Sequence, residues 1–85
     1  MASKESLLRK ISQKPTPRDF TMRELVHLMS LCNCLIVETS SGSGIKFIHE
    51  KTGKVLTIHR PHPGNTLYID IVKRVVKFLH SIGEL

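Results

Sequence analysis

The chain has 85 residues, of which 40% are hydrophobic and 24% are charged, and this is the length and composition of one compact globular domain. A core of this size has no interior that could enclose a large organic cofactor, so we expect a surface site and no cofactor. Thirteen Lys and Arg residues against seven Asp and Glu residues give a net charge of +6, which favours contact with polyanions such as RNA. A role in solubility, or pairing with an acidic partner, would also account for this charge.

The cysteines and the lengths of the apolar runs indicate the cellular compartment in which the protein is expected. The first ten residues lack the apolar core of an export signal, and no apolar run reaches the roughly 18 residues that a membrane span needs. Cys32 and Cys34 are separated by one residue, which suits neither a disulfide framework nor a zinc site. We therefore expect a cytoplasmic protein with no metal site and with reduced thiols that pack as small apolar side chains.

A short helix and a linker are predicted ahead of the main domain. Residues 4–14 carry Leu7, Leu8 and Ile11 at helical spacing, and the prolines at positions 15 and 17 end that pattern. The linker is expected to run over residues 14–19. We therefore assign residues 1–19 to an N-terminal helical extension with its linker, and residues 20–85 to the functional domain.

The second helix is predicted to begin at a capping box. Thr21 is followed three residues later by Glu24, so each side chain can accept a hydrogen bond from the backbone N–H of the other residue. An apolar stripe at helical spacing follows and predicts one buried face. The stripe consists of Leu25, Leu28, Met29 and Cys32.

Three strands and a closing helix are predicted next. The β-branched pair Ile36 and Val37 favours a strand over residues 35–39, and residues 45–49 and 54–59 flank a turn at 50–53. An amphipathic helix then runs from Ile69 to about Ile82 and ends at Gly83. This order predicts an α+β fold, in which a three-stranded antiparallel sheet has its helices on one face.

The four-residue turn also fixes the register of the hairpin. It places His49 opposite Lys54 and, at the far end of the hairpin, Gly44 opposite His59. Successive side chains alternate between the two faces of a sheet. The row predicted to face the core consists of Ile45, Phe47, Leu56 and Ile58. The row predicted to face solvent consists of Gly44, Lys46, Thr57 and His59.

Two segments of this region resemble the HicA family of toxin–antitoxin ribonucleases. They are Gly42-Ser43-Gly44-Ile45-Lys46-Phe47 and Ile58-His59-Arg60-Pro61-His62-Pro63. The resemblance covers about residues 22–83 and is closest to longer members that have an N-terminal extension. It implies a fold like that of double-stranded-RNA-binding domains and a metal-independent activity that cleaves mRNA. It also implies a HicB-type antitoxin that covers the active face.

The chain departs from the family pattern at position 44. The resemblance implies a catalytic histidine directly after Gly42-Ser43, but the residue there is Gly44, which cannot transfer a proton. A natural loss of activity, a base located elsewhere, or a substitution that tames a toxic protein would each account for the glycine.

His59 is the first candidate to replace the missing histidine. The register puts it across from Gly44, where opposing Cβ atoms lie roughly 4.5–5.5 Å apart, and an imidazole titrates near neutral pH. His62 is the second candidate, because the prolines on either side of it stiffen its loop. Each also has a purely structural interpretation, as an exposed strand end and as a rigid turn. The other histidines, to which we assign no chemistry, are His27, His49 and His80.

Basic residues around the histidines are candidates for binding RNA phosphates. The predicted RNA-binding set is Ser43, Lys46, Arg60, Lys73, Arg74 and Lys77. Lys46 and Arg60 flank the histidines, whereas the last three residues form a basic surface on the final helix. An ordinary solvated helix face would account for that surface equally well. The sequence predicts an RNA-binding toxin and endoribonuclease, with an inactive RNA-binding module or a protein-interaction subunit as alternatives.

Overall fold

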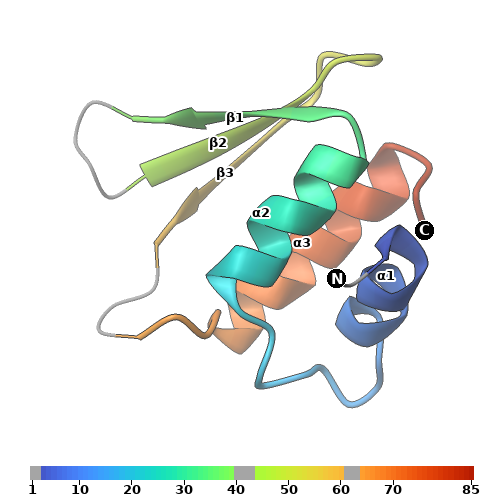
Figure 1. The fold of residues 1–85 in the computed structure, drawn as a ribbon, viewed down its shortest axis with the longest axis vertical. Helices are drawn as coiled ribbons and strands as arrows, with labels where there is room; N and C mark the ends of the chain where they lie inside the picture. Colours follow the sequence, from blue (N-terminus) through green and yellow to red (C-terminus); the bar gives the residue numbers. More distant parts are fainter. Residues whose placement is uncertain (1–2, 40–43, 61–63) are drawn as a thin grey trace.

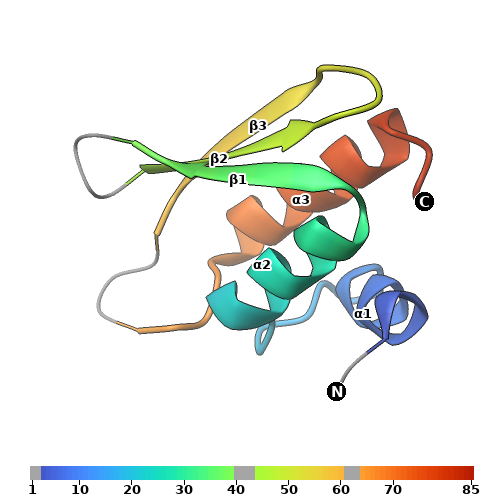
Figure 2. The same ribbon diagram turned by 45° about the horizontal axis from the view of Figure 1, so that its top comes forward.

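The computed structural model describes residues 3–39, 44–60 and 64–85. Its elements are α1 (Lys4–Ile11), α2 (Met22–Leu31), β1 (Cys34–Glu38), β2 (Gly44–His49), β3 (Val55–His59) and α3 (Ile69–Ser81). The strands form one antiparallel sheet in the order β1-β2-β3, and α2 and α3 pack beneath one face of it (Figure 1). Helix α1 lies beyond these helices, on the side away from the sheet (Figure 2). The predicted α+β fold is confirmed.

The first helix is shorter than the sequence predicted. It ends at Ile11 instead of near position 14. The Ser12 hydroxyl donates to the Leu8 carbonyl at 2.8 Å and to the Arg9 carbonyl at 3.3 Å, and the Arg9 carbonyl is the acceptor that the Gln13 N–H would need for the helix to continue. Pro15 also disfavours a helical conformation at the residue before it. The linker to α2 therefore begins at Ser12.

The predicted capping box is present at the start of α2. The Thr21 hydroxyl accepts a hydrogen bond from the Glu24 N–H, and the Glu24 carboxylate accepts one from the Thr21 N–H. The Lys10 ammonium of α1 binds the same carboxylate at 2.9 and 3.0 Å. It also lies 5.7 Å from the centroid of the Phe20 ring. One lysine thus joins α1 to the start of α2.

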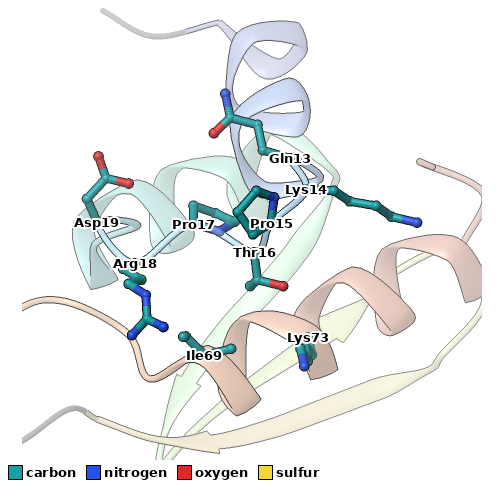
Figure 3. Close-up of a pocket in the computed structure, with 9 residues that line it drawn as sticks. All are labelled: Gln13, Lys14, Pro15, Thr16, Pro17, Arg18, Asp19, Ile69 and Lys73. Carbon is teal, nitrogen blue, oxygen red and sulfur yellow. The ribbon is translucent and has the colours of Figure 1, made fainter.

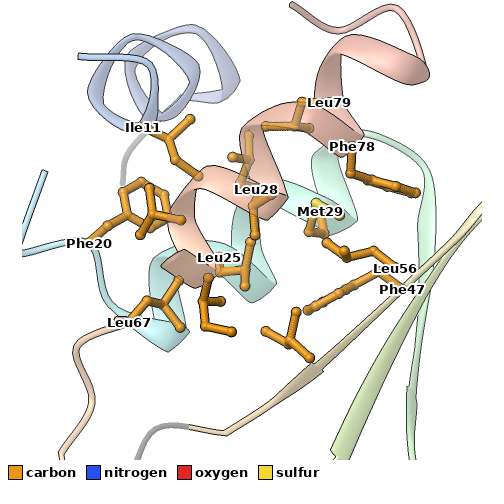
Figure 4. Close-up of a cluster of buried hydrophobic side chains, with 14 of the residues drawn as sticks. Ile11, Phe20, Leu25, Leu28, Met29, Phe47, Leu56, Leu67, Phe78 and Leu79 are labelled. Atoms are coloured by element: carbon orange, nitrogen blue, oxygen red, sulfur yellow. The ribbon is translucent and has the colours of Figure 1, made fainter. Parts of the chain in front are cut away.

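A single hydrophobic core fills the space between the sheet and the helices, and Figure 4 shows side chains from all three helices converging on it. The largest fully buried side chains include Phe20, Phe47, Leu7, Ile11, Leu25, Leu28, Met29, Ile45, Ile58 and Leu79. Two of them, Leu7 and Ile11, come from α1. Because burial of one such side chain stabilises a fold by about 1.5–3 kcal/mol, α1 is an integral part of this core.

The hairpin register agrees with the prediction. Gly44 pairs with His59, and Lys46 pairs with Thr57. The turn closes through a hydrogen bond of 2.8 Å from the His49 N–H to the Lys54 carbonyl. His49 is 4% exposed, and its ring contacts the Thr52 hydroxyl within the turn, so it has the packing role that the register predicted.

Strand β1 begins one residue earlier than predicted. Asn33 has a φ of 62°, the left-handed conformation that commonly ends a helix, so the chain reverses at once and Cys34 already pairs with His49. Both cysteines are buried free thiols. Burial and the neighbouring Glu84 raise the pKa of Cys32 to about 11, so this thiol is protonated and unreactive at neutral pH.

The closing helix α3 is amphipathic, as predicted. It ends at Ser81, and Gly83 follows with a φ of 82°, a conformation that glycine adopts without strain. In the part of the chain that the structure describes, no helix combines the length and the apolar character required to cross a membrane.

Candidate functional site

Helices α2 and α3 cover one face of the sheet, and none of the helices that the structure describes covers the other, as Figures 1 and 2 show. Strand pairing arranges the side chains of this open face in three cross-strand rows. An apolar row contains Leu35, Ile48 and Val55, a middle row contains Val37, Lys46 and Thr57, and a polar row contains Thr39, Gly44 and His59. The open face therefore changes from apolar at the hairpin-turn end to polar at the opposite end.

The polar row has Gly44 at its centre. The Thr39 N–H and hydroxyl both approach the Gly44 carbonyl, at 3.0 and 3.2 Å. A Cβ atom added at position 44 would lie 2.9 Å from Thr39 Oγ1 and 3.1 Å from its Cγ2. Thr39 therefore fills the space that a side chain at position 44 would need.

Thr39 was not among the predicted site residues. The signal for it was present, because positions 39 and 44 are separated by four residues, as are His49 and Lys54 at the other end of β2. The counting that placed His59 opposite Gly44 would also have placed Thr39 on the other side of this glycine.

His59 is exposed on the open face at the end of β3, directly across from Gly44. Its ring has no hydrogen-bond partner among the described residues. Lys46 is exposed on the same face, in the adjacent row. The structure thus brings His59, Gly44 and Lys46 together, as the register predicted. The two other candidates in this region, His62 and Ser43, lie outside the described residues.

Arg60 has a different environment from His59. Its guanidinium binds the Glu38 carboxylate at the end of β1. It also lines a hollow of about 500 Å³ together with Arg23 and His27 of α2. Arg60 therefore lies on the helix side, while His59 lies on the open face. Arg23 and His27 were not predicted as site residues, although their spacing of four residues puts them on one face of a helix.

The three basic residues of α3 are all exposed but have different surroundings. Lys73 lines a hollow against the linker between α1 and α2. Arg74 donates a hydrogen bond of 2.7 Å to the Thr57 carbonyl on the outer edge of β3, which ties α3 to that edge strand. Lys77 projects one helical turn after Lys73. Within the described ranges, no three His, Cys, Asp or Glu side chains form a group that could hold a metal ion.

A comparison with protein families identifies the family of this chain. The model of the family described as HicA toxin of bacterial toxin-antitoxin matches residues 22–83. The chain belongs to the HicA toxin family. The match covers most of this HicA-family chain and leaves α1 and the linker outside it. No curated protein and no solved structure matches the chain.

Proposed function

We propose that this HicA-family chain is the toxin of a type II toxin–antitoxin system, an endoribonuclease that binds and cleaves mRNA and is inhibited by a HicB-type antitoxin. Residues 20–85 would carry the activity. The main support is the polar end of the open face, where exposed His59 lies across from Gly44 with Lys46 in the adjacent row. Family membership and the net charge of +6 support RNA as the substrate class.

The proposed chemistry is a metal-independent transesterification. His59 takes the proton of a ribose 2′-hydroxyl, the 2′-oxygen attacks the adjacent phosphorus, and the bond from phosphorus to the 5′-oxygen breaks. His62 donates a proton to the leaving 5′-oxygen. Lys46 stabilises the charge that develops on the phosphate oxygens. Further contacts with the RNA backbone, away from the cleaved phosphate, are assigned to Arg60 on the helix side and to Lys73, Arg74 and Lys77 on α3. Ser43 is also assigned a phosphate contact.

Cleavage of a structured mRNA by the purified protein tests this proposal. Loss of a general acid or base lowers the rate by roughly 10²–10⁴-fold, so His59→Ala is expected to lose that much activity. His80→Ala removes another exposed histidine, at the end of α3, and serves as the matched control. Equal rates for the wild type and His59→Ala would remove His59 from the mechanism.

Gly44 favours a second candidate function, a catalytically inactive RNA-binding module. The family's histidine position has no side chain here, and Thr39 occupies the space beside it. This alternative predicts salt-sensitive RNA binding without strand scission at any protein concentration. A protein-interaction subunit would instead show no RNA affinity and would bind an acidic partner tightly.

The apolar residues of the open face support a protein partner there. Leu35 and Val55 are each 51% exposed and Val37 is 44% exposed, and half-buried Ile48 lies between the first two. A contiguous exposed apolar patch on a small protein commonly marks an interaction surface. A HicB-type antitoxin on this face would bury the patch and block access to His59.

A further inference from the structure

A groove lies between the α1–α2 linker and α3, and it includes residues outside the family match. Its main hollow, of about 820 Å³, is lined by residues 13–19, Ile69 and Lys73 (Figure 3). A smaller hollow of about 250 Å³ shares residues of the linker and Lys73 with it, and reaches Val76 further along α3. We call these two hollows together the linker groove.

The linker groove carries a concentration of unneutralised positive charge. Lys14, Arg18 and Lys73 line the main hollow, and none of them has an ion-pair partner among the described residues. The carboxylate of Asp19, which also lines it, lies 3.9 Å from the Lys10 ammonium. Figure 3 shows Arg18 directed toward α3, whereas the Asp19 carboxylate points away from that helix. Anions approaching the groove therefore meet three cations.

The second half of the linker, which carries Arg18, is held in a fixed position. Pro17 is buried and Phe20 is 0% exposed, so the second half of the linker is anchored in the core. Backbone hydrogen bonds also connect it to the segment before α3, from the Leu67 N–H to the Phe20 carbonyl and from the Met22 N–H to the Asn65 carbonyl. A ligand bound here would lose less free energy to ordering of the chain than one bound by a mobile tail.

We propose that the linker groove is a second RNA-contact site, in which Lys14 and Arg18 bind backbone phosphates beside Lys73. This inference rests on the proposed function and extends it to the N-terminal segment. Phosphates are bound by cations, hydroxyls and backbone N–H groups, and the Thr16 hydroxyl, which points toward α3 in Figure 3, adds a donor to the three cations. Three cations and one hydroxyl, with no carboxylate among the described residues directed into the groove, favour a phosphate backbone over a protein segment as the occupant.

Lys73 connects this site with the rest of the basic surface. It lines the linker groove and lies one turn before Lys77 on the exposed side of α3. An RNA backbone that follows α3 would therefore contact Lys77, Lys73 and the linker in succession. The N-terminal segment would lengthen the RNA footprint of the family-matched domain.

The test is binding of a fluorescein-labelled RNA hairpin, with a stem of about 16 base pairs, to the full-length protein at about 50–200 mM salt. The variant is Lys14→Gln/Arg18→Gln, and the charge-matched control is Arg9→Gln/Lys51→Gln, which changes exposed residues outside the groove. We expect the groove variant to bind at least about tenfold more weakly at 0.1 M salt. The slope of log affinity against log salt should fall by about 1–2, with no such change in the control.

Three results would overturn the inference in distinguishable ways. If the groove variant binds RNA as the wild type does while Lys77→Gln binds it more weakly, the linker groove is not an RNA-contact site, and the proposed function still holds. No RNA affinity in the wild-type protein would remove both together. Retained RNA affinity with loss of antitoxin binding would assign the groove to an acidic protein partner.

Discussion

Any side chain placed at position 44 meets Thr39. A Cβ atom there would lie 2.9 Å from Thr39 Oγ1, closer than real Cβ contacts, and 3.1 Å from its Cγ2, which is tighter than most of them. Gly44→His therefore forces the Thr39 side chain to rotate or β1 to shift, and overpacking of this kind costs roughly 1–3 kcal/mol. Thr39→Ala removes both contacting atoms and opens the space. The cost of a histidine at position 44 thus depends on position 39.

We expect Gly44→His to lower the free energy of unfolding by about 1–3 kcal/mol, and Thr39→Ala/Gly44→His to recover most of this loss. Urea unfolding of the two single variants and the double variant measures the coupling between the two sites. Thr39→Ala alone loses the hydroxyl contact with the Gly44 carbonyl, at a cost of about 0.5–1.5 kcal/mol, and is the reference. If the free-energy changes of the two single variants simply add in the double variant, Thr39 does not determine the cost of a histidine at position 44. RNA cleavage by the double variant then reports whether a histidine here adds activity.

Among the secondary-structure elements, the β2–β3 hairpin could be derived from the sequence because two independent signals agree. The four-residue turn sets one register, and that register places Phe47 and Ile58 on the same side as the other apolar residues. A slip of one residue would have put Lys46 in the core. The prolines at positions 15 and 17 located the end of α1 less precisely, because hydrogen bonds from the Ser12 side chain contribute to the earlier boundary at Ile11.

The candidate site could be predicted only in part, for a related reason. His59 was placed opposite Gly44 because backbone pairing alone determines that contact. The side-chain contact of Arg60 with Glu38, and the position of Arg18 beside α3, join residues far apart in the sequence. No periodicity or turn length specifies such contacts, so they emerge only from the packed structure.

Helix α1 lies outside the family match, and its packing predicts that the domain depends on it. Leu7 is 2% exposed within the core, whereas its neighbour Leu8 is half-buried at the edge. Leu7→Ala is expected to lower the free energy of unfolding by about 2–5 kcal/mol, and the matched control Leu8→Ala by clearly less. Urea denaturation of both variants provides the comparison. Equally small effects would mean that α1 adds little to stability.

The contact between α1 and α2 is expected to be sensitive to acid. Burial tends to raise the pKa of Glu24, but hydrogen bonds from Lys10 and Thr21 outweigh it and hold this pKa below the ordinary value of 4.5. The folded protein therefore binds this proton less tightly than the unfolded chain does, and the stabilisation present above pH 4.5 is lost as the pH falls through the lower, folded-state pKa.

Thermal unfolding between about pH 3 and pH 7 tests the contribution of this carboxylate. Glu24→Gln keeps the size of the side chain and its acceptor for the Thr21 N–H but has no titratable group. We expect the variant to be less stable than the wild type at pH 7 and the difference to shrink below pH 4.5. A difference in melting temperature that stays constant across this range would exclude Glu24 as the titrating group.

At the scale of the whole molecule, the two proposed interaction surfaces lie on different sides. The open face is the side of the sheet away from α2 and α3, whereas the linker groove lies between the linker and α3 on the helical side (Figures 2 and 3). An antitoxin seated on the open face would cover His59 and Lys46 and leave Lys14 and Arg18 accessible. The inhibited complex is therefore expected to retain weak, salt-sensitive RNA affinity.

The apolar row of the open face is separate from the basic residues proposed to bind phosphates, so antitoxin binding and RNA binding are expected to respond to different substitutions. Leu35→Gln/Val55→Thr makes the exposed apolar row polar. The complex would then bury less apolar area, so we expect antitoxin binding to weaken by about tenfold. RNA-hairpin affinity should stay unchanged, because neither side chain carries a charge that a phosphate contacts. Leu31→Gln alters an exposed leucine on α2 and is the control. Calorimetric titration with the antitoxin measures the first effect, and fluorescence anisotropy measures the second. Parallel losses in both would show that RNA binding also depends on the apolar row of the open face.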